Sequence, residues 1–303
     1  MLKTFSRAAL SAVLALPVST ALALCLAPAA SARQQQQQQQ QNQQQQQQQR
    51  AQKKKLQASS NFAQYAGRDA SNRLIAGGAT RGVAADEAAQ FSQKGQDAYE
   101  AGKYDEAVAA FQRVTELKPT DARAFYHLGV SHETAGHYKE AVAAYRKAAA
   151  LTDRMEIKAM SFYNLGNSYA ADSQPKEAAE AYKQVIALVP DQPVAHYNLA
   201  LAYAAAGQYE EAVTEFKQAV KLKADYAEAE FNLGITYGNL GRFDAAADAF
   251  KRAAQLKPDY AEAHYNLGLA DLALDDKAGV QSEIKTLETL NKTLAARLKS
   301  LSQ

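Results

Sequence analysis

The stretch PVAHYNLALAYAAAGQYEEAVTEFKQAVKLKADY, from Pro193 to Tyr226, contains two runs of apolar residues with the period of an α-helix. The first run extends from Val194 to Ala206 and ends at Gly207, a residue that suits a helix C-terminus. The second run extends from Glu210 to Leu222. The stretch therefore predicts two helices joined by a tight turn.

The same pattern returns along the chain in repeats of 34 residues, with three extra residues in the second repeat. The six repeats begin at Ala88, Ala122, Ala159, Pro193, Ala227 and Ala261. A helix pair of this length cannot bury its apolar face alone, so neighbouring pairs stack and share a core. The sequence therefore predicts an all-α solenoid over residues 88–290.

Certain positions of the repeat, numbered 1 to 34, keep one kind of side chain. Position 8 is small in every repeat (Gly95, Gly129, Gly166, Ala200, Gly234, Gly268). Position 24 is aromatic in the first five repeats (Phe111, Tyr145, Tyr182, Phe216, Phe250). Alanine at position 20 and the small residue at position 8 let two helix backbones approach closely, and we expect the aromatic ring to fill the space between repeats.

At these positions the sequence resembles the tetratricopeptide repeat family. The shared features are the small residue at position 8, glycine at position 15, aromatics at positions 17 and 24, alanine at position 20 and proline at position 32. The third repeat departs at its turn, with Ser173 and Pro175 at positions 15 and 17. The resemblance implies a right-handed superhelical solenoid of about six helix-turn-helix repeats, whose first helices line a concave groove.

The two ends of the repeat region differ from its middle. The first repeat has Lys94 where other repeats have leucine at position 7, and the sixth has Asp275 and Lys277 at its turn. Solenoid ends lack a neighbour and need a polar outer face. Residues 291–303, which carry Leu294, Leu298 and Leu301, predict a capping helix.

The N-terminus has the features of a secretory signal over residues 1–32. Lys3 and Arg7 precede a largely apolar stretch, and Ala30-Ser31-Ala32 is an A-x-A cleavage site. Cleavage would remove Cys25, the single cysteine, which suits an oxidising compartment such as the periplasm or the extracellular space. If the signal is retained, its long uncharged run anchors the chain to a membrane. Cys25 is also weakly typical of a lipoprotein signal, although Leu24 is not the small residue that such a signal requires.

Residues 33–87 predict a disordered linker. Gln34 to Gln49 is glutamine interrupted only by Asn42, and such a tract has no apolar side chains to bury. Lys53, Lys54 and Lys55 follow, and the segment has a net charge of +5. It acts as a solvated spacer or as a tether attracted to an acidic surface such as lipid headgroups. Within it, Gly77 to Gly82 predict a flexible joint.

Asparagine recurs at position 6 as Asn164, Asn198, Asn232 and Asn266, with His127 at the same place in the second repeat. Helical counting directs position 6 away from the core positions 4, 7, 8 and 11. The resemblance places it in the concave groove, similar to an asparagine ladder that grips a peptide backbone in the family. An amide offers both a donor and an acceptor to a peptide bond. Alternatively, position 6 is simply exposed and was copied when the repeats were duplicated.

Other side chains flank this asparagine row. Position 5 is aromatic (Tyr126, Tyr163, Tyr197, Phe231, Tyr265), and position 9 is Asn167, Leu201, Ile235 and Leu269 in the last four repeats. The aromatic row is also consistent with packing against the next repeat. The groove has no lysine, which argues against the acidic C-terminal peptides that some family members bind. We expect a polypeptide segment with apolar side chains.

The sequence contains no evident catalytic or polyanion-binding chemistry. The net charge is +2, and beyond residue 32 the basic and acidic residues are equal in number, which disfavours nucleic acid as a partner. His127, His132 and His137 are five residues apart and do not share a helix face, while His196 and His264 occupy packing position 4. We therefore expect no enzyme activity, no cofactor and no metal.

The sequence is consistent with two functions. The first is an exported, non-enzymatic adaptor or scaffold of the cell envelope that binds a polypeptide segment in its groove. The alternative is a structural component that stacks on itself or docks in a multi-protein envelope assembly, with the groove unused. We expect a monomer under the first hypothesis.

Overall fold

The computed structural model describes residues 82–303, with side chains from residue 85. The predicted signal and most of the glutamine-rich linker lie outside the described residues. Within that range the chain forms thirteen α-helices and no strand. None of these helices is both long enough and apolar enough to cross a membrane.

The described residues fall into two compact parts, 82–190 and 191–303, here called the N-terminal half and the C-terminal half. The N-terminal half contains α3 (Gly82–Glu100), α4 (Tyr104–Leu117), α5 (Ala122–Ala135), α6 (Tyr138–Ala150), α7 (Met155–Ala171) and α8 (Pro175–Leu188). The C-terminal half contains α9 (Pro193–Ala205), α10 (Tyr209–Leu222), α11 (Ala227–Asn239), α12 (Phe243–Leu256), α13 (Ala261–Ala273), α14 (Lys277–Leu290) and α15 (Lys292–Leu301).

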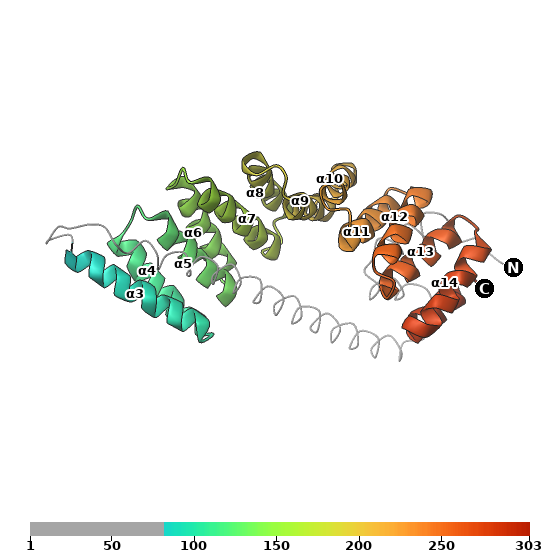
Figure 1. Ribbon diagram of the computed structural model, residues 1–303, viewed down its shortest axis with the longest axis horizontal. Coiled ribbons are helices and arrows are strands. Elements are labelled where there is room, and N and C mark those ends of the chain that lie inside the picture. Colours follow the sequence, from blue (N-terminus) through green and yellow to red (C-terminus); the bar gives the residue numbers. More distant parts are fainter. Residues whose placement is uncertain (1–81) are drawn as a thin grey trace, which may run out of the picture. The chain divides into compact units, whose positions relative to one another are not determined.

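Inside each half, every first helix of a repeat packs on its own second helix, and that second helix packs on the next first helix (Figure 1). The helix α15 closes the last repeat by packing on α13 and α14. The predicted all-α fold of six stacked helix pairs with a capping helix is therefore confirmed.

Two first helices begin earlier than the repeat pattern predicts. The helix α3 begins at Gly82, six residues before Ala88, so the assignment of residues 82–87 to a disordered linker is wrong. This extension carries Glu87, whose carboxylate accepts a hydrogen bond from Arg113 Nη2 of α4 at 2.9 Å. Likewise α7 begins at Met155 rather than Ala159, because the extra residues of the second repeat add a helical turn.

The turn inside each repeat has the same backbone geometry in all six repeats. Its position 15 has a positive φ throughout: Gly102 75°, Gly136 85°, Ser173 60°, Gly207 77°, Gly241 70° and Asp275 60°. Glycine adopts this left-handed conformation without steric cost, whereas serine and aspartate do so less often. The departures at Ser173 and Asp275 therefore change the residue but leave the turn as it is.

The small residue at position 8 receives the aromatic ring of position 24 from the same repeat. A Cβ atom on Gly129 would lie 2.7 Å from the ring of Tyr145, and one on Gly234 would lie 2.6 Å from the ring of Phe250. Both rings are completely buried. The ring was expected to fill the space between repeats. It does so only in part, as when Phe111 stacks on His127 of the next repeat at 5.4 Å.

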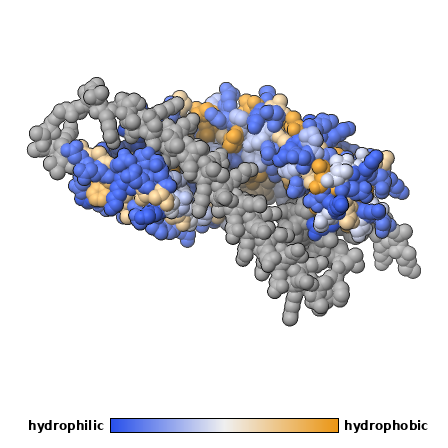
Figure 2. Space-filling view, turned by 60° about the horizontal axis from the view of Figure 1, so that its bottom comes forward, coloured by the Kyte–Doolittle hydropathy of each residue, from blue (hydrophilic) through white to orange (hydrophobic). Residues whose placement is uncertain are grey.

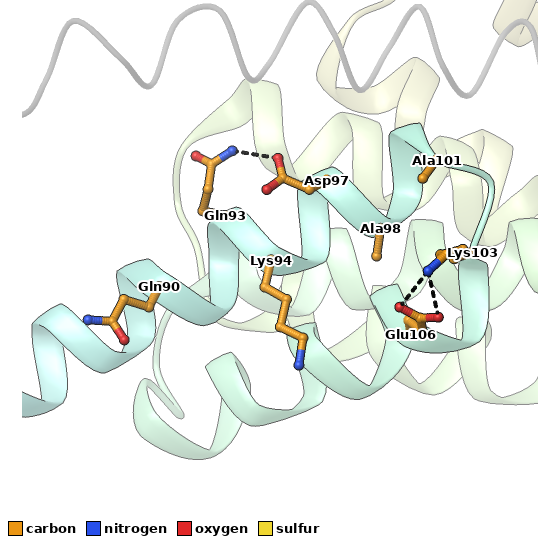
Figure 3. Close-up of a pocket in the computed structure, with 8 residues that line it drawn as sticks. All are labelled: Gln90, Gln93, Lys94, Asp97, Ala98, Ala101, Lys103 and Glu106. Carbon is orange, nitrogen blue, oxygen red and sulfur yellow. Dashed lines mark hydrogen bonds and ion pairs between the residues drawn. The ribbon is translucent and has the colours of Figure 1, made fainter.

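The two ends of the repeat region are finished in different ways. In the sixth repeat, Gly268 receives Leu298 of the capping helix instead of an aromatic ring. In the first repeat, a depression of about 570 Å³ lies between α3 and the start of α4 (Figure 3). It exposes Gln90, Lys94 and Asp97, at the positions where the second repeat buries Ala124, Leu128 and Ser131. The polar outer face expected for a solenoid end is therefore present.

Replacing Gly234 by alanine tests the close contact. We expect Gly234→Ala to lower the free energy of unfolding by about 1–3 kcal/mol, because the added methyl group overlaps the buried ring of Phe250. Urea unfolding monitored by circular dichroism measures this change. In a Phe250→Leu background the same replacement should cost less, and equal costs in both backgrounds would show that the ring is not responsible.

Position 4 of the first helix and position 23 of the second helix differ between the two halves. The three repeats of the N-terminal half have phenylalanine and alanine there, whereas the C-terminal half has His196 with Glu215 and His264 with Glu283 in its first and last repeats. In each of these two pairs Nδ1 of the histidine lies 2.6 Å from Oε2 of the glutamate. Between them, Glu230 pairs with Arg252 at 2.8 Å. The histidines are packing residues as predicted, but the sequence reasoning missed their glutamate partners.

Because of the interaction between His264 and Glu283, we expect the protein to lose stability as the pH rises. Its hydrogen bond to Glu283 raises the pKa of His264, against the opposing effect of burial. The pair's contribution is thus complete below about pH 6.5, the ordinary pKa of histidine, and is lost as pH rises through the higher folded value. We expect the Tm to fall over this interval. The double replacement His264→Phe with Glu283→Ala, which copies the N-terminal half, should flatten the profile.

Asp271 titrates at lower pH than His264, and its effect on stability must be distinguished from that of His264. Burial, Asp276 and Glu283 raise the pKa of Asp271 to about 6. Its ionisation therefore lowers stability between about pH 4 and pH 6, below the interval of His264. A wild-type Tm that stays constant from pH 6.5 to pH 8.5 would contradict the role given to His264.

Candidate functional site

The candidate site is one face of the first helices, formed by positions 2, 5, 6 and 9 of each repeat and here called the ladder face. It contains the asparagine row and all the side chains that the sequence predicts to contact a ligand. Each half has its own ladder face, carried by α3, α5 and α7 in the N-terminal half and by α9, α11 and α13 in the C-terminal half.

The asparagines connect successive repeats. In the N-terminal half Asn164 Nδ2 donates to Tyr126 Oη at 3.0 Å, and in the C-terminal half Asn232 Nδ2 donates to Tyr197 Oη at 3.0 Å. Each bond joins position 6 of one repeat to position 5 of the repeat before it. The recurrence of asparagine therefore has a structural reason, which counting along a single helix did not show.

The exposure of the row is lower than expected. Asn164 is 8% exposed and Asn266 is 4% exposed, whereas Asn198 and Asn232 are half-buried. Asn266 follows a repeat with Phe231 at position 5, which has no hydroxyl group, and its Nδ2 donates to the Glu262 carbonyl oxygen at 2.8 Å instead. Two of the four predicted ladder residues are thus largely enclosed by protein.

Asn232 is held in a defined orientation. Its Nδ2 donates to Tyr197 Oη at 3.0 Å and to the Glu228 carbonyl oxygen at 2.8 Å. An amide NH₂ group has two hydrogens, so both are used. The group that Asn232 offers to a ligand is therefore its Oδ1 acceptor.

The aromatic row at position 5 mostly belongs to the core. Tyr126 and Tyr265 are buried, and Tyr163, Tyr197 and Phe231 are half-buried. Each of these last three packs on the position 24 ring of its own repeat, with centroid distances of 6.1, 5.8 and 5.7 Å. The alternative of a packing role is thus supported for this row.

Position 34 adds aromatic residues that the sequence reasoning missed. The ring of Tyr226 packs on Tyr197 in a tilted arrangement with centroids 4.9 Å apart, and the ring of Tyr260 packs on Phe231 in the same way at 4.8 Å. The sequence contains a sign of this row, because Tyr226 directly precedes α11 and Tyr260, 34 residues later, directly precedes α13.

The remaining predicted residues divide between core and surface. His127 packs on Phe111 and Tyr126, and Asn167 Oδ1 accepts a hydrogen bond from Tyr182 Oη at 2.8 Å. Leu269 is 1% exposed in the core cluster that the capping helix completes, so it does not face a ligand.

The C-terminal half retains apolar surface on α9. Leu201 is 36% exposed and Val194 is 37% exposed, whereas Ile235 is half-buried. Other exposed apolar side chains, among them Met155, Leu256 and Leu274, lie outside the ladder face. Figure 2 shows a mostly hydrophilic face with small, separate apolar patches. The two α9 side chains lie beside the asparagine row and are available to a partner.

Metal ligation has no support within residues 85–303, where no three His, Cys, Asp or Glu side chains are grouped to hold an ion. His132 and His137 lie 5.8 Å apart between ring centroids, and His137 Nε2 lies 4.0 Å from Asp105 Oδ1. The arrangement offers hydrogen bonding and apolar contact, which is the chemistry of binding.

Comparison with known families agrees with this arrangement. A family profile described as "Tetratricopeptide repeat" matches residues 92–155, and one described as "TPR repeat" matches residues 166–207, 202–241 and 239–274. Together the matches cover more than half of the chain. The chain belongs to the tetratricopeptide repeat family. Proteins of this family are interaction modules, so a role in protein–protein interaction follows in this broad sense.

Solved structures with this tetratricopeptide repeat fold include MamA, which is 23% identical with a TM-score of 0.54, over 59% of this chain and 96% of that one. A MamA fragment from Desulfovibrio magneticus RS-1 is 23% identical with a TM-score of 0.53, over 58% and 97%. YrrB, described as "a TPR protein with an unusual peptide-binding site", is 23% identical with a TM-score of 0.55, over 64% and 100%. At this identity the likeness shows the fold alone. No curated protein sequence matches this tetratricopeptide repeat chain.

The tyrosine–asparagine bond predicts a measurable coupling between repeats. We expect Tyr197→Phe to lower the free energy of unfolding by about 0.5–1.5 kcal/mol, because Asn232 loses a hydrogen-bond acceptor. The reciprocal change Phe231→Tyr supplies a hydroxyl to Asn266 and should raise stability. Urea unfolding of both variants measures the effects, and an unchanged Tyr197→Phe variant would show that the bond contributes nothing.

Proposed function

We propose that this protein is an exported, non-enzymatic adaptor that holds an extended polypeptide segment on its ladder face. The observation that carries the proposal is Asn232, whose amide hydrogens are both used by protein groups and whose oxygen remains for a ligand. YrrB supports the idea, since it is described as having a peptide-binding site on the same fold.

The chemistry suits a peptide backbone. An extended chain presents its N–H groups at regular intervals, and an outward amide oxygen such as Asn232 Oδ1 can accept a hydrogen bond from one of them. The bond to Tyr197 fixes the Asn232 side chain before a ligand arrives, which reduces the entropy cost of binding. Exposed Val194 and Leu201 supply apolar contact next to the row.

The proposed location is the periplasm or the extracellular space, and it rests on the signal-like residues 1–32. Retention of that segment would tether the adaptor to a membrane. The polar end of the first repeat, around Lys94, does not favour stacking of one copy on another. We therefore place the adaptor ahead of a self-assembling structural component and expect a monomer.

The test compares two variants that break the same hydrogen bond. Asn232→Ala removes both the Tyr197 bond and the amide oxygen, whereas Tyr197→Phe removes only the bond. Each full-length protein is crosslinked in the native envelope fraction, and the captured proteins are identified by mass spectrometry. Far-UV circular dichroism at the temperature of the capture experiment checks that both variants are folded.

We expect specific partners that are captured by the wild type and by Tyr197→Phe and are lost with Asn232→Ala. Partners captured equally by all three proteins would rule out the ladder face as the binding surface. Asn164 and Asn266 are left unchanged, because both are buried and their replacement would disturb the core.

A further inference from the structure

Most positive charges of the C-terminal half gather at one edge of its solenoid. Each second helix follows its first helix after a tight turn, so α10, α12 and α14 run in the same direction and their last turns lie on the same side. This surface, positions 25 to 34 of the last three repeats, is here called the basic edge. It carries eight of the twelve lysines and arginines of residues 191–303: Lys217, Lys221, Lys223, Lys251, Arg252, Lys257, Lys285 and Lys292.

The basic edge is positive within a half that is negative. Residues 191–303 contain sixteen acidic and twelve basic side chains, but only three of the acidic ones lie on the edge: Asp225, Asp259 and Glu288. Within residues 85–303 none of the seven lysines of the edge forms an ion pair, and Arg252 pairs with Glu230. The excess of positive charge is therefore presented to the surroundings.

Two lysines of the basic edge are held by aromatic rings. Lys223 Nζ lies 4.7 Å from the ring centroid of Tyr226, and Lys257 Nζ lies 5.1 Å from that of Tyr260. A cation over an aromatic ring is attracted to it, which restricts the flexible lysine side chain. Both lysines remain exposed. Two ammonium groups thus occupy equivalent places one repeat apart.

Three leucines lie on the same edge with much of their surface in water. Leu222 is 38% exposed, Leu256 is 42% exposed and Leu290 is 38% exposed. They occupy position 30 of successive repeats, and Leu222 and Leu256 are directly followed by the ring-held lysines. The leucines at this position in the N-terminal half are only half-buried rather than exposed: Leu117, Leu151 and Leu188. The basic edge is therefore amphipathic as well as charged.

Stabilisation of helix ends accounts for only part of this pattern. The helix dipole favours cations in the last turn of a helix and disfavours them in the first, and the effect falls off within one turn. Lys217, Lys251 and Lys285 lie five residues before the ends of their helices, and Lys292 is the first residue of α15, where the dipole opposes it. The dipole also gives no reason for exposed leucines. Lysines beside exposed leucines suit a ligand that is anionic at its surface and apolar beneath.

We propose that the basic edge of the C-terminal half binds the surface of a membrane that contains anionic lipid. The lysines contact the phosphate headgroups, and Leu222, Leu256 and Leu290 enter the boundary between headgroups and acyl chains. A bilayer offers both chemistries over a continuous surface, whereas an acidic polypeptide offers mainly charge.

The sequence contains a second positively charged segment, Lys53 to Lys55, which is also suited to an anionic surface. Stable attachment to a membrane takes more than one weak signal, so the two are complementary. The basic edge is a different surface from the ladder face, and this inference therefore does not depend on the adaptor function. The test must separate the edge from residues 1–81.

The chain contains no tryptophan, so a single introduced tryptophan reports on its own surroundings. Leu256→Trp places this reporter on the basic edge, and the control Leu201→Trp places it on the exposed ladder face. Each full-length protein is mixed with vesicles of phosphatidylcholine or of phosphatidylcholine with phosphatidylglycerol. We expect the emission of Leu256→Trp to shift to shorter wavelength only with the anionic vesicles, because the indole leaves water. The emission of Leu201→Trp should stay unchanged.

Matched charge variants in the Leu256→Trp protein test the lysines. Each lysine near an anionic surface strengthens binding about fivefold, so Lys223→Gln with Lys257→Gln should raise the lipid concentration for half of the shift about twentyfold. The control, Lys277→Gln with Lys299→Gln, changes exposed residues at the far ends of α14 and α15 and should change it little. Both double variants alter the net charge equally. Equal losses would show that overall charge attracts the vesicles, which would overturn the proposal.

Two further outcomes would also overturn the proposal. If the protein sediments with anionic vesicles but the emission of Leu256→Trp does not shift, residues 1–81 attach the chain and the basic edge does not. If poly-glutamate shifts the emission of Leu256→Trp and anionic vesicles do not, the edge takes an acidic polypeptide instead of lipid. None of these results bears on the adaptor function, which is tested separately by capture with Asn232→Ala.

Discussion

The contact between the small residue at position 8 and the ring at position 24 determines how close the two helices of a repeat lie. Gly95, Gly129, Gly166 and Gly234 each leave too little room for a Cβ atom beneath the ring. Because the rings are buried, this approach also fixes where the opposite face of each first helix lies. The Tyr197–Asn232 bond needs that placement, since a hydrogen bond tolerates only a few tenths of an ångström.

Much of the fold could be predicted because it depends on residues that recur with a regular spacing along the chain. The 34-residue repeat, the turn, the small and aromatic positions and the capping helix are all local patterns with a direct physical meaning. The start of α3 was missed because the repeat alignment began at Ala88, and the extension is stabilised by Arg113, which lies in another helix. Ser173 and Asp275 keep the positive φ of the turn although neither is glycine.

The candidate site was harder to predict, and the reason is geometric. A helical wheel describes one helix, whereas Asn164 finds its partner Tyr126 on another, and Asn266 is enclosed by its surroundings. Positions 5 and 6 of successive repeats had to be considered together. The charged pairs of the C-terminal half were missed for the same reason, although His196 and His264 each occur with a glutamate 19 residues later.

The packing of Leu298 into the space above Gly268 has a consequence for how such a chain can change in length. An inner repeat offers its aromatic ring to its own glycine, so this contact is kept when the repeat is duplicated or deleted as a module. The sixth repeat depends on Leu298, a side chain that belongs to α15 and not to the repeat itself. Removal of α15 would therefore expose the core of the sixth repeat. Insertions of whole repeats are therefore tolerated ahead of Ala261, whereas the last repeat and its cap must be inherited together.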